Sequence, residues 1–225
     1  MRNVFKLFMT ACLLVSVAMT GVAQKDYSKS EGLLKYVDPY IGSGFHGHVF
    51  VGTSVPYGMV QVGPNNIHKG WDWCSGYHYS DSILIGFSQT HLNGTGCTDL
   101  GDIMIMPMNE IRTERGKQSD ISNGYASKYS HENEIARPEY YSLLVERYNI
   151  KAEMTATDRV GFHRYTYPAG KPASILVNLH EGNSYTKAKM CYVRKVDDYT
   201  IEGYRYSHDW SPNRKVYFVL KADQK

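Results

Sequence analysis

The second half of the chain alternates apolar and polar residues with the period of β-strands. Residues 150–156 give the clearest case, because every second side chain is apolar: Ile150, Ala152, Met154 and Ala156. The positions between them are polar or charged, so this segment predicts a strand with one buried face. Other short apolar runs with strand-like spacing lie at residues 141–147, 160–167, 174–179, 190–195, 199–206 and 216–220.

Turn residues separate these runs roughly every 8 to 12 residues, which favours antiparallel sheets over alternating strand and helix units. We therefore expect an all-β fold, an antiparallel β-sandwich with long polar excursions between strands. Residues 116–135 are polar and are predicted to form one such excursion. The sandwich is expected to be a single domain over residues 36–225 that is cut short at its C-terminal end.

The first 23 residues have the pattern of a secretory signal peptide. Arg2 and Lys6 supply positive charge, residues 7–22 are almost entirely apolar or small, and Ala23 completes a small-x-small cleavage site. Retention as a membrane anchor is the alternative, but polar residues interrupt the run, which is short for a span of about 20 residues. We expect a signal peptide over residues 1–23, a polar leader over residues 24–35, and export to the periplasm, the outer surface or the medium. The mature chain would then have no membrane span.

Charge excludes one class of partner. The chain has 25 Lys and Arg against 22 Asp and Glu, and cleavage would remove two of the basic residues, Arg2 and Lys6. The remaining basic residues are scattered and form no stripe, so nucleic acid is not expected as a partner.

Three cysteines remain after cleavage: Cys74, Cys97 and Cys191. An odd number leaves at least one thiol unpaired within the chain. For Cys74 and Cys97 two interpretations stay open, a disulfide in an oxidising compartment or small buried thiols near a binding floor.

Residues 70–107 concentrate aromatic, short polar and glycine residues more densely than packing needs. Flat aromatic faces next to hydrogen-bonding side chains suit a sugar, whose C–H faces stack on rings and whose hydroxyls need polar partners. Trp71 and Trp73 flank Asp72, so in an extended segment both rings would share one face and Asp72 would point away. Burial of both rings in the sandwich core is the alternative.

Five ordered motifs resemble the start of glycoside hydrolase family 92. They are DPYIG at residues 38–42, GFHGH at 44–48, VPYGMVQVGP at 55–64, GYHYSD at 76–81 and GFSQTHLNGTGC at 86–97. The resemblance implies an inverting, calcium-dependent exo-α-mannosidase that acts on mannose-containing glycans such as α-1,2-mannosides. It also implies that the sandwich forms one wall of the sugar pocket, whereas a larger α-barrel domain supplies the acid, the base and the main calcium ligands.

The chain departs from the family pattern at three points. Gln89 stands where the family favours His, and Val51 stands where it favours Pro. The sequence also ends at Lys225, so the resemblance implies that the catalytic barrel is missing and that the calcium ligands lie outside this chain.

The motifs nominate eight residues for contact with the substrate. They are Gly44, Phe45, His46, Trp71, Trp73, His91, Asn93 and Thr95. Residues 93–95 also match an N-glycosylation sequon, but the resemblance implies a bacterial source, where the loop is better explained as facing the substrate.

We expect no catalytic residue and no metal ligand in this chain. His46 and His48 lie two residues apart, and metal binding is one interpretation of that pair, but a third ligand is needed and no CxxC or HExxH motif supplies it. Four aspartates, Asp72, Asp81, Asp99 and Asp102, crowd into one short stretch, whereas glycoside hydrolysis needs two carboxyl groups on opposite sides of the scissile bond.

Three hypotheses remain. The chain is half of an active site that needs a barrel domain, a freestanding carbohydrate-binding module, or a truncated inactive fragment. Half of an active site should leave a large apolar face uncovered beside residues 71–95, and a freestanding module should not.

Overall fold

The computed structural model describes residues 32–183 and 187–224. The predicted signal peptide and most of the predicted leader lie outside the described residues. Residues 32–37 belong to a separate N-terminal unit and make one exposed helical turn, whereas the remaining described residues form a second unit. None of the helices in the described ranges is long and apolar enough to cross a membrane.

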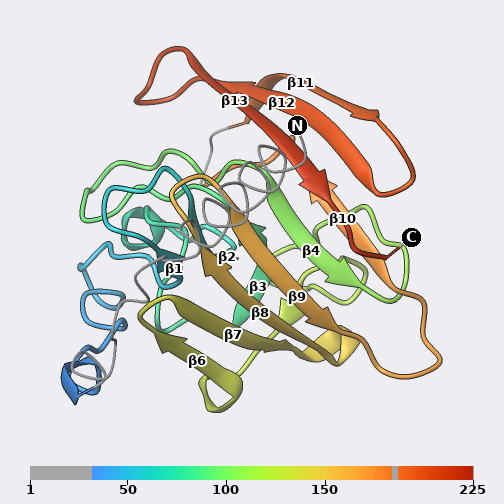
Figure 1. Cartoon of the computed structure of the whole chain (residues 1–225). Helices are drawn as coiled ribbons and strands as arrows, with labels where there is room; N and C mark the ends of the chain where they lie inside the picture. Colours follow the sequence, from blue (N-terminus) through green and yellow to red (C-terminus); the bar gives the residue numbers. More distant parts are fainter. Residues whose placement is uncertain (1–31, 184–186, 225) are drawn as a thin grey trace, which may run out of the picture. The chain divides into compact units, whose positions relative to one another are not determined.

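The second unit is all-β and antiparallel, as the sequence predicts (Figure 1). A six-stranded sheet contains β1 (Thr53–Ser54), β2 (Gln61–Asn66), β3 (Ile83–Ser88), β4 (Met104–Met108), β10 (Ser174–Asn178) and, beside β3, β5 (Ser127–Lys128). A four-stranded sheet follows the chain order β6 (Glu134–Arg137), β7 (Tyr140–Val145), β8 (Ile150–Ala156) and β9 (Gly161–Thr166). A three-stranded sheet contains β11 (Ala188–Lys195), β12 (Thr200–Ser207) and β13 (Arg214–Lys221).

The main hydrophobic core lies between the six-stranded and the four-stranded sheets. β8 supplies Ile150, Ala152, Met154 and Ala156, all buried as their spacing predicts. β4 is buried along its whole length because both of its faces are covered. The sandwich interpretation is therefore confirmed, with β8 as the strand whose pattern predicts it best.

Residues 116–135 are more ordered than the predicted excursion. They contain β5, the 3-10 turn η2 (His131–Asn133) and the start of β6, and they bury Tyr125 and Tyr129. The hydroxyls of these tyrosines accept hydrogen bonds from Asn178 Nδ2 at 3.0 Å and Asn66 Nδ2 at 3.2 Å. Two buried tyrosines with polar partners thus anchor a segment whose composition suggests a loop.

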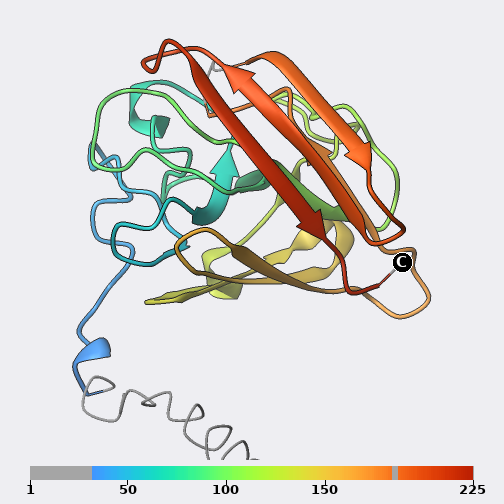
Figure 2. The same cartoon turned by 45° about the horizontal axis from the view of Figure 1, so that its top comes forward.

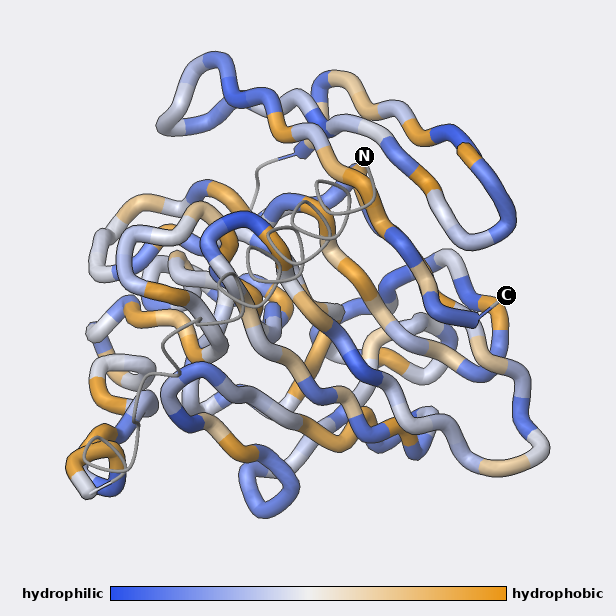
Figure 3. The backbone as a smooth tube through the Cα atoms, in the orientation of Figure 1, coloured by the Kyte–Doolittle hydropathy of each residue, from blue (hydrophilic) through white to orange (hydrophobic). Residues whose placement is uncertain are grey.

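The three-stranded sheet has two edge strands, because among the described strands β11 and β13 each pair only with β12. Figure 2 shows the sheet as a layer of its own, and Figure 3 shows apolar and polar segments alternating along it. Its outer face is mostly exposed, but Arg205 and Ser207 of β12 are buried on the other face.

Candidate functional site

Three loops from separate parts of the sequence meet around Asp72. They are the loop of residues 42–48, the 3-10 turn η1 (Trp71–Trp73) between β2 and β3, and the loop of residues 91–101 between β3 and β4. Gly94 N donates to the His48 carbonyl at 2.8 Å, and Trp71 Nε1 donates to the Gly96 carbonyl at 2.9 Å. The glycine-rich motifs recognised in the sequence therefore form one surface.

The loop of residues 42–48 turns back on itself and pushes two side chains outward. Gly42, Phe45 and His48 have φ of 82°, 54° and 56°, and a Cβ at Gly47 would lie 1.9 Å from the Gly42 carbonyl oxygen. Only glycine fits at that close approach. Phe45, which is 80% exposed, and His46 then project together with ring centroids 4.1 Å apart.

Two histidines converge on the Asp72 carboxylate. His46 Nδ1 lies 2.5 Å from Asp72 Oδ1, and His48 Nε2 lies 3.6 Å from the same oxygen. The hydrogen bond with His46 lowers the pKa of Asp72 below its ordinary value, so this carboxylate is ionised at neutral pH. The His48 side chain is buried, and its Nε2 makes no hydrogen bond and faces the Asp72 carboxylate from the interior side.

Trp71 and Trp73 do not lie in an extended segment, as the alternation around Asp72 suggested. The tight turn η1 points Asp72 toward the histidines and separates the two indoles. Trp71 is exposed, and its ring centroid lies 4.1 Å from that of His48. Trp73 is half-buried, donates from Nε1 to Asp81 Oδ2 at 2.7 Å and stacks on His78. Of the two indoles, Trp71 alone offers an open face.

His91 lies in the interior behind the loops. Its ring stacks on Phe50, Nδ1 lies 2.8 Å from the Gln61 carbonyl oxygen and Nε2 lies 3.2 Å from Ser88 Oγ. Burial lowers the pKa of His91 to about 4, so the ring is neutral and Nδ1 carries the donated proton. The structure places this ring under the loop rather than on its surface. The substrate contact predicted for His91 stays a prediction.

Asn93 and Thr95 lie on the outer part of the 91–101 loop. Asn93 is exposed, and the Thr95 carbonyl accepts a hydrogen bond from Cys74 Sγ at 3.0 Å. Cys74 and Cys97 are free thiols, and burial raises the pKa of Cys74 to about 11, which keeps it protonated. The structure thus brings Gly44, Phe45, His46, Trp71, Asn93 and Thr95 to neighbouring loops, with Trp73 and His91 behind them.

The other three aspartates of the motif region are committed to protein donors. Asp81 accepts from Trp73, from Lys69 at 2.9 Å and from two backbone amides. Asp99 and Asp102 are buried and paired with arginines. Calcium needs six to eight oxygen ligands, and within residues 32–183 and 187–224 no group of three or more His, Cys, Asp or Glu could hold a metal ion. The described residues do not fit a calcium ion.

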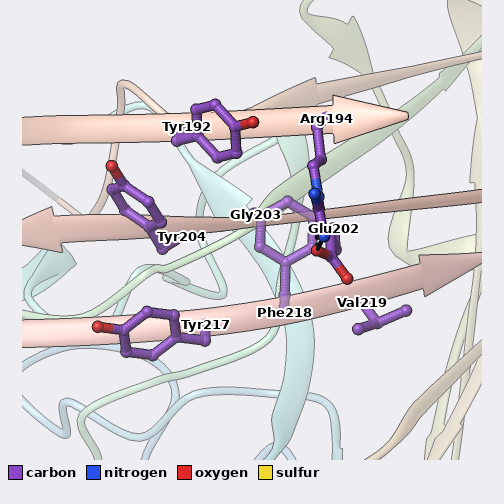
Figure 4. A pocket seen from close by; sticks show the side chains of 8 residues that line it. All are labelled: Tyr192, Arg194, Glu202, Gly203, Tyr204, Tyr217, Phe218 and Val219. Carbon is purple, nitrogen blue, oxygen red and sulfur yellow. Dashed lines mark hydrogen bonds and ion pairs between the residues drawn. The ribbon is translucent and has the colours of Figure 1, made fainter. Parts of the chain in front are cut away.

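The outer face of the three-stranded sheet carries an open, tyrosine-lined hollow. Figure 4 shows Tyr192, Tyr204 and Tyr217, one from each strand, beside the ion pair of Arg194 and Glu202. The sequence alone does not distinguish this exposed face from a core face, because both kinds of face carry large side chains at every second position of a strand.

The family model and the similar proteins described below are all glycosidases. Residues 36–225 match the model of the glycosyl hydrolase family 92 N-terminal domain. The chain is similar to a family 92 α-mannosidase from Bacteroides thetaiotaomicron, solved in complex with mannoimidazole, with 39% identity and a TM-score of 0.80 over 83% of this chain. A family 92 inverting mannosidase from the same organism shares the fold, with 23% identity and a TM-score of 0.65 over 83% of this chain.

A curated relative from Arthroderma benhamiae is called an uncharacterized secreted glycosidase. It is 30% identical over 154 residues, which are 65% of this chain and 20% of that protein. The chain likewise spans about a quarter of the length of each solved mannosidase, 25% and 24% respectively.

Proposed function

Because the chain belongs to the glycosyl hydrolase family 92 N-terminal domain family, we propose that it is the carbohydrate-contacting sandwich of an exo-α-mannosidase. The surface around Asp72 forms one wall of the sugar pocket. The observation that carries this proposal is the convergence of three distant loops, which bring the exposed rings of Phe45, His46 and Trp71 next to one ionised carboxylate.

The ligand we propose is a terminal mannose of glycans such as α-1,2-mannosides. Trp71 offers a stacking face, and the partly exposed Asp72 carboxylate and His46 ring offer polar atoms for hydroxyls. Exposure of Ile41 beside this surface supports half of a pocket over a freestanding module, because an aliphatic side chain offers a sugar no stacking face and a module that works alone gains nothing by leaving it uncovered.

NMR titration with methyl α-mannoside tests the ligand. Trp71→Ala should weaken binding roughly 2- to 10-fold, the value of one aromatic contact. Tyr192→Ala, which removes an exposed ring from β11, is the matched control and should leave binding unchanged. Spectra of the folded protein that do not respond to high sugar concentration would contradict a preformed site.

We further propose that this chain does not hydrolyse α-mannosides unaided. Inversion requires two carboxyl groups about 6.5–9.5 Å apart, each free to act on the substrate or water. Asp72 is available, whereas Asp81, Asp99 and Asp102 are held by protein donors. Release of mannose from an aryl α-mannoside should therefore be absent with or without calcium. Turnover that Asp72→Asn abolishes would move the active site into the sandwich.

Export is the remaining part of the proposal. The charged start and apolar run of the first 23 residues support it, and one relative is called secreted. Mass spectrometry of protein recovered outside the cytoplasm should find Gln24 at the N-terminus. An intact Met1 on that material would contradict cleavage.

A further inference from the structure

Four charged side chains meet in the interior where the 91–101 loop returns to β4. Arg205 of β12 and Asp102 both have fully buried side chains, and Arg205 Nη1 donates to Asp102 Oδ1 at 2.5 Å. Arg214 of β13 reaches both carboxylates: Nη1 donates to Asp99 Oδ1, and Nε lies 3.1 Å from Asp102 Oδ2. Two positive and two negative groups balance one another, and only Arg214 keeps a small exposed fraction.

The two carboxylates fix the base of the loop. Asp99 Oδ1 accepts from Leu100 N at 2.8 Å, and Asp102 Oδ2 accepts from Thr90 Oγ1 at 2.9 Å. Leu100 and Gly101 have φ of 68° and 74°, and the left-handed region is unfavourable for leucine. A strained backbone persists only where its surroundings hold it, and here the held residues sit between two arginine-bound aspartates.

The far part of the same loop contacts the candidate sugar surface. Gly94 N donates to the His48 carbonyl at 2.8 Å, and the Gly96 carbonyl accepts from Trp71 Nε1 at 2.9 Å. The same loop thus connects the arginine-bound aspartates to the carbonyl that accepts from the Trp71 ring.

Stability alone is a poor reason for such a network. Burying ions costs free energy, and well-packed apolar replacements of a buried ion pair are often neutral or stabilising. Apolar residues cannot fix the orientation of a carboxylate. An arginine can, because its guanidinium presents several donors in a rigid plane and can bridge two carboxylates at fixed angles.

We propose that Arg205 and Arg214 are positioning residues, through which the β12–β13 hairpin sets the geometry of the 91–101 loop and hence of Trp71. This role concerns ligand recognition and rests on the proposed function for its sugar readout. Its structural readout, the environment of the Trp71 indole, does not need a ligand.

The test compares the full wild-type chain with two variants by NMR. Asp102→Asn/Arg205→Met removes one charge of each sign, so no ion is left alone, and Arg214→Gln removes the bridge between the carboxylates. Arg194→Met, which breaks the exposed pair with Glu202 in the same sheet, is the matched control. The Trp71 indole N–H signal, assigned with Trp71→Phe, should shift or broaden in both variants, and the Gly94 amide should exchange at least about tenfold faster, which corresponds to about 1.4 kcal/mol. The control should change neither.

Binding of methyl α-mannoside separates the two proposals. Wild-type protein that does not bind the sugar counts against the proposed function, but a shifted Trp71 signal in the variants still supports positioning. A folded variant with the wild-type Trp71 signal and wild-type Gly94 exchange would overturn the positioning role, whatever its stability. Arg214→Lys adds a further check: lysine keeps the charge but not the planar fork, so it should fail to restore the Trp71 signal, and full restoration would show that charge alone suffices.

Discussion

The four-stranded and three-stranded sheets are both rich in tyrosine, yet they use it in opposite ways. Tyr141 of β7 is fully buried, and its hydroxyl donates to the buried Glu134 carboxylate at 2.6 Å. Tyr217 of β13 is 64% exposed, and its hydroxyl lies 2.6 Å from that of Tyr206 on the neighbouring strand. The hydroxyl of Tyr141 has a buried charged partner, whereas the hydroxyl of Tyr217 has only another tyrosine at the surface.

The largest difference should appear on truncation of apolar side chains. Leu143→Ala in β7 leaves a cavity in the core and should cost about 2–5 kcal/mol of unfolding free energy. Val219→Ala in β13 removes an exposed group and should stay within about 0.5 kcal/mol. Urea unfolding of both variants measures the contrast. Equal losses would mean that another part of the protein covers the outer face in solution.

The second-largest difference in unfolding free energy should separate a buried carboxylate from an exposed one. Glu134 also lies 2.6 Å from His131 Nδ1 and accepts from Tyr77 at 3.1 Å, so Glu134→Gln leaves buried donors poorly paired. We expect a loss of roughly 1–3 kcal/mol by the same assay. Glu202→Gln breaks only an exposed ion pair in the three-stranded sheet and should have a clearly smaller effect. A larger loss at Glu202 would reverse the ranking of the two sheets.

Acid should destabilise the protein through two histidines outside the three-stranded sheet, His91 and His163. Burial lowers the pKa of His163 in β9, and of His91, to about 4, whereas an unfolded histidine titrates near 6.5. The unfolded chain therefore binds these protons first, so the stability contributed by the neutral rings is complete above pH 6.5 and is lost as the pH falls toward 4. His163→Gln should flatten the decline in urea midpoint over this window. An unchanged slope would contradict the lowered pKa of His163.

The smallest effect concerns a single hydroxyl. The hydrogen bond with Tyr217 raises the pKa of Tyr206 to about 12, so Tyr217→Phe should return the pKa of Tyr206 toward 10. The side-chain carbon signals of tyrosine in an NMR pH titration measure it. Tyr192→Phe in the same face is the control, and a Tyr206 pKa that ignores Tyr217 would mean that the pair is not formed in solution.

How far the sequence predicts the fold depends on the strand. In β8, every second residue faces the core, so the alternation gives both the strand and its buried side. In β13 the burial alternates, but residues 216–220 are all apolar and the exposed face carries Tyr217 and Val219, so the sequence alone cannot tell which side meets another layer. Composition misleads for residues 116–135, because the partners of Tyr125 and Tyr129 lie more than fifty residues away.

The candidate site, too, can be predicted from the sequence only in part. Ordered motifs identify the loops of Phe45, Trp71 and Asn93, and the structure brings these loops together. The orientation of Asp72 toward His46 depends on the 3-10 turn, which a Trp-Asp-Trp sequence does not reveal. Arg205 and Arg214 lie more than a hundred residues from the loop that they contact, and no local pattern marks them.

The open edges of the three-stranded sheet have a practical consequence for anyone who handles this chain in solution. Within the described strands, β11 and β13 pair only with β12, so each presents a row of backbone donors and acceptors to any extended peptide. Proteins guard such edges with charge, lysine above all. Here Lys189 and Lys195 lie on one edge, and Lys215 and Lys221 lie near the two ends of the other. Replacing these lysines with neutral residues is therefore the change most apt to turn a well-behaved sample into a self-associating one at high concentration.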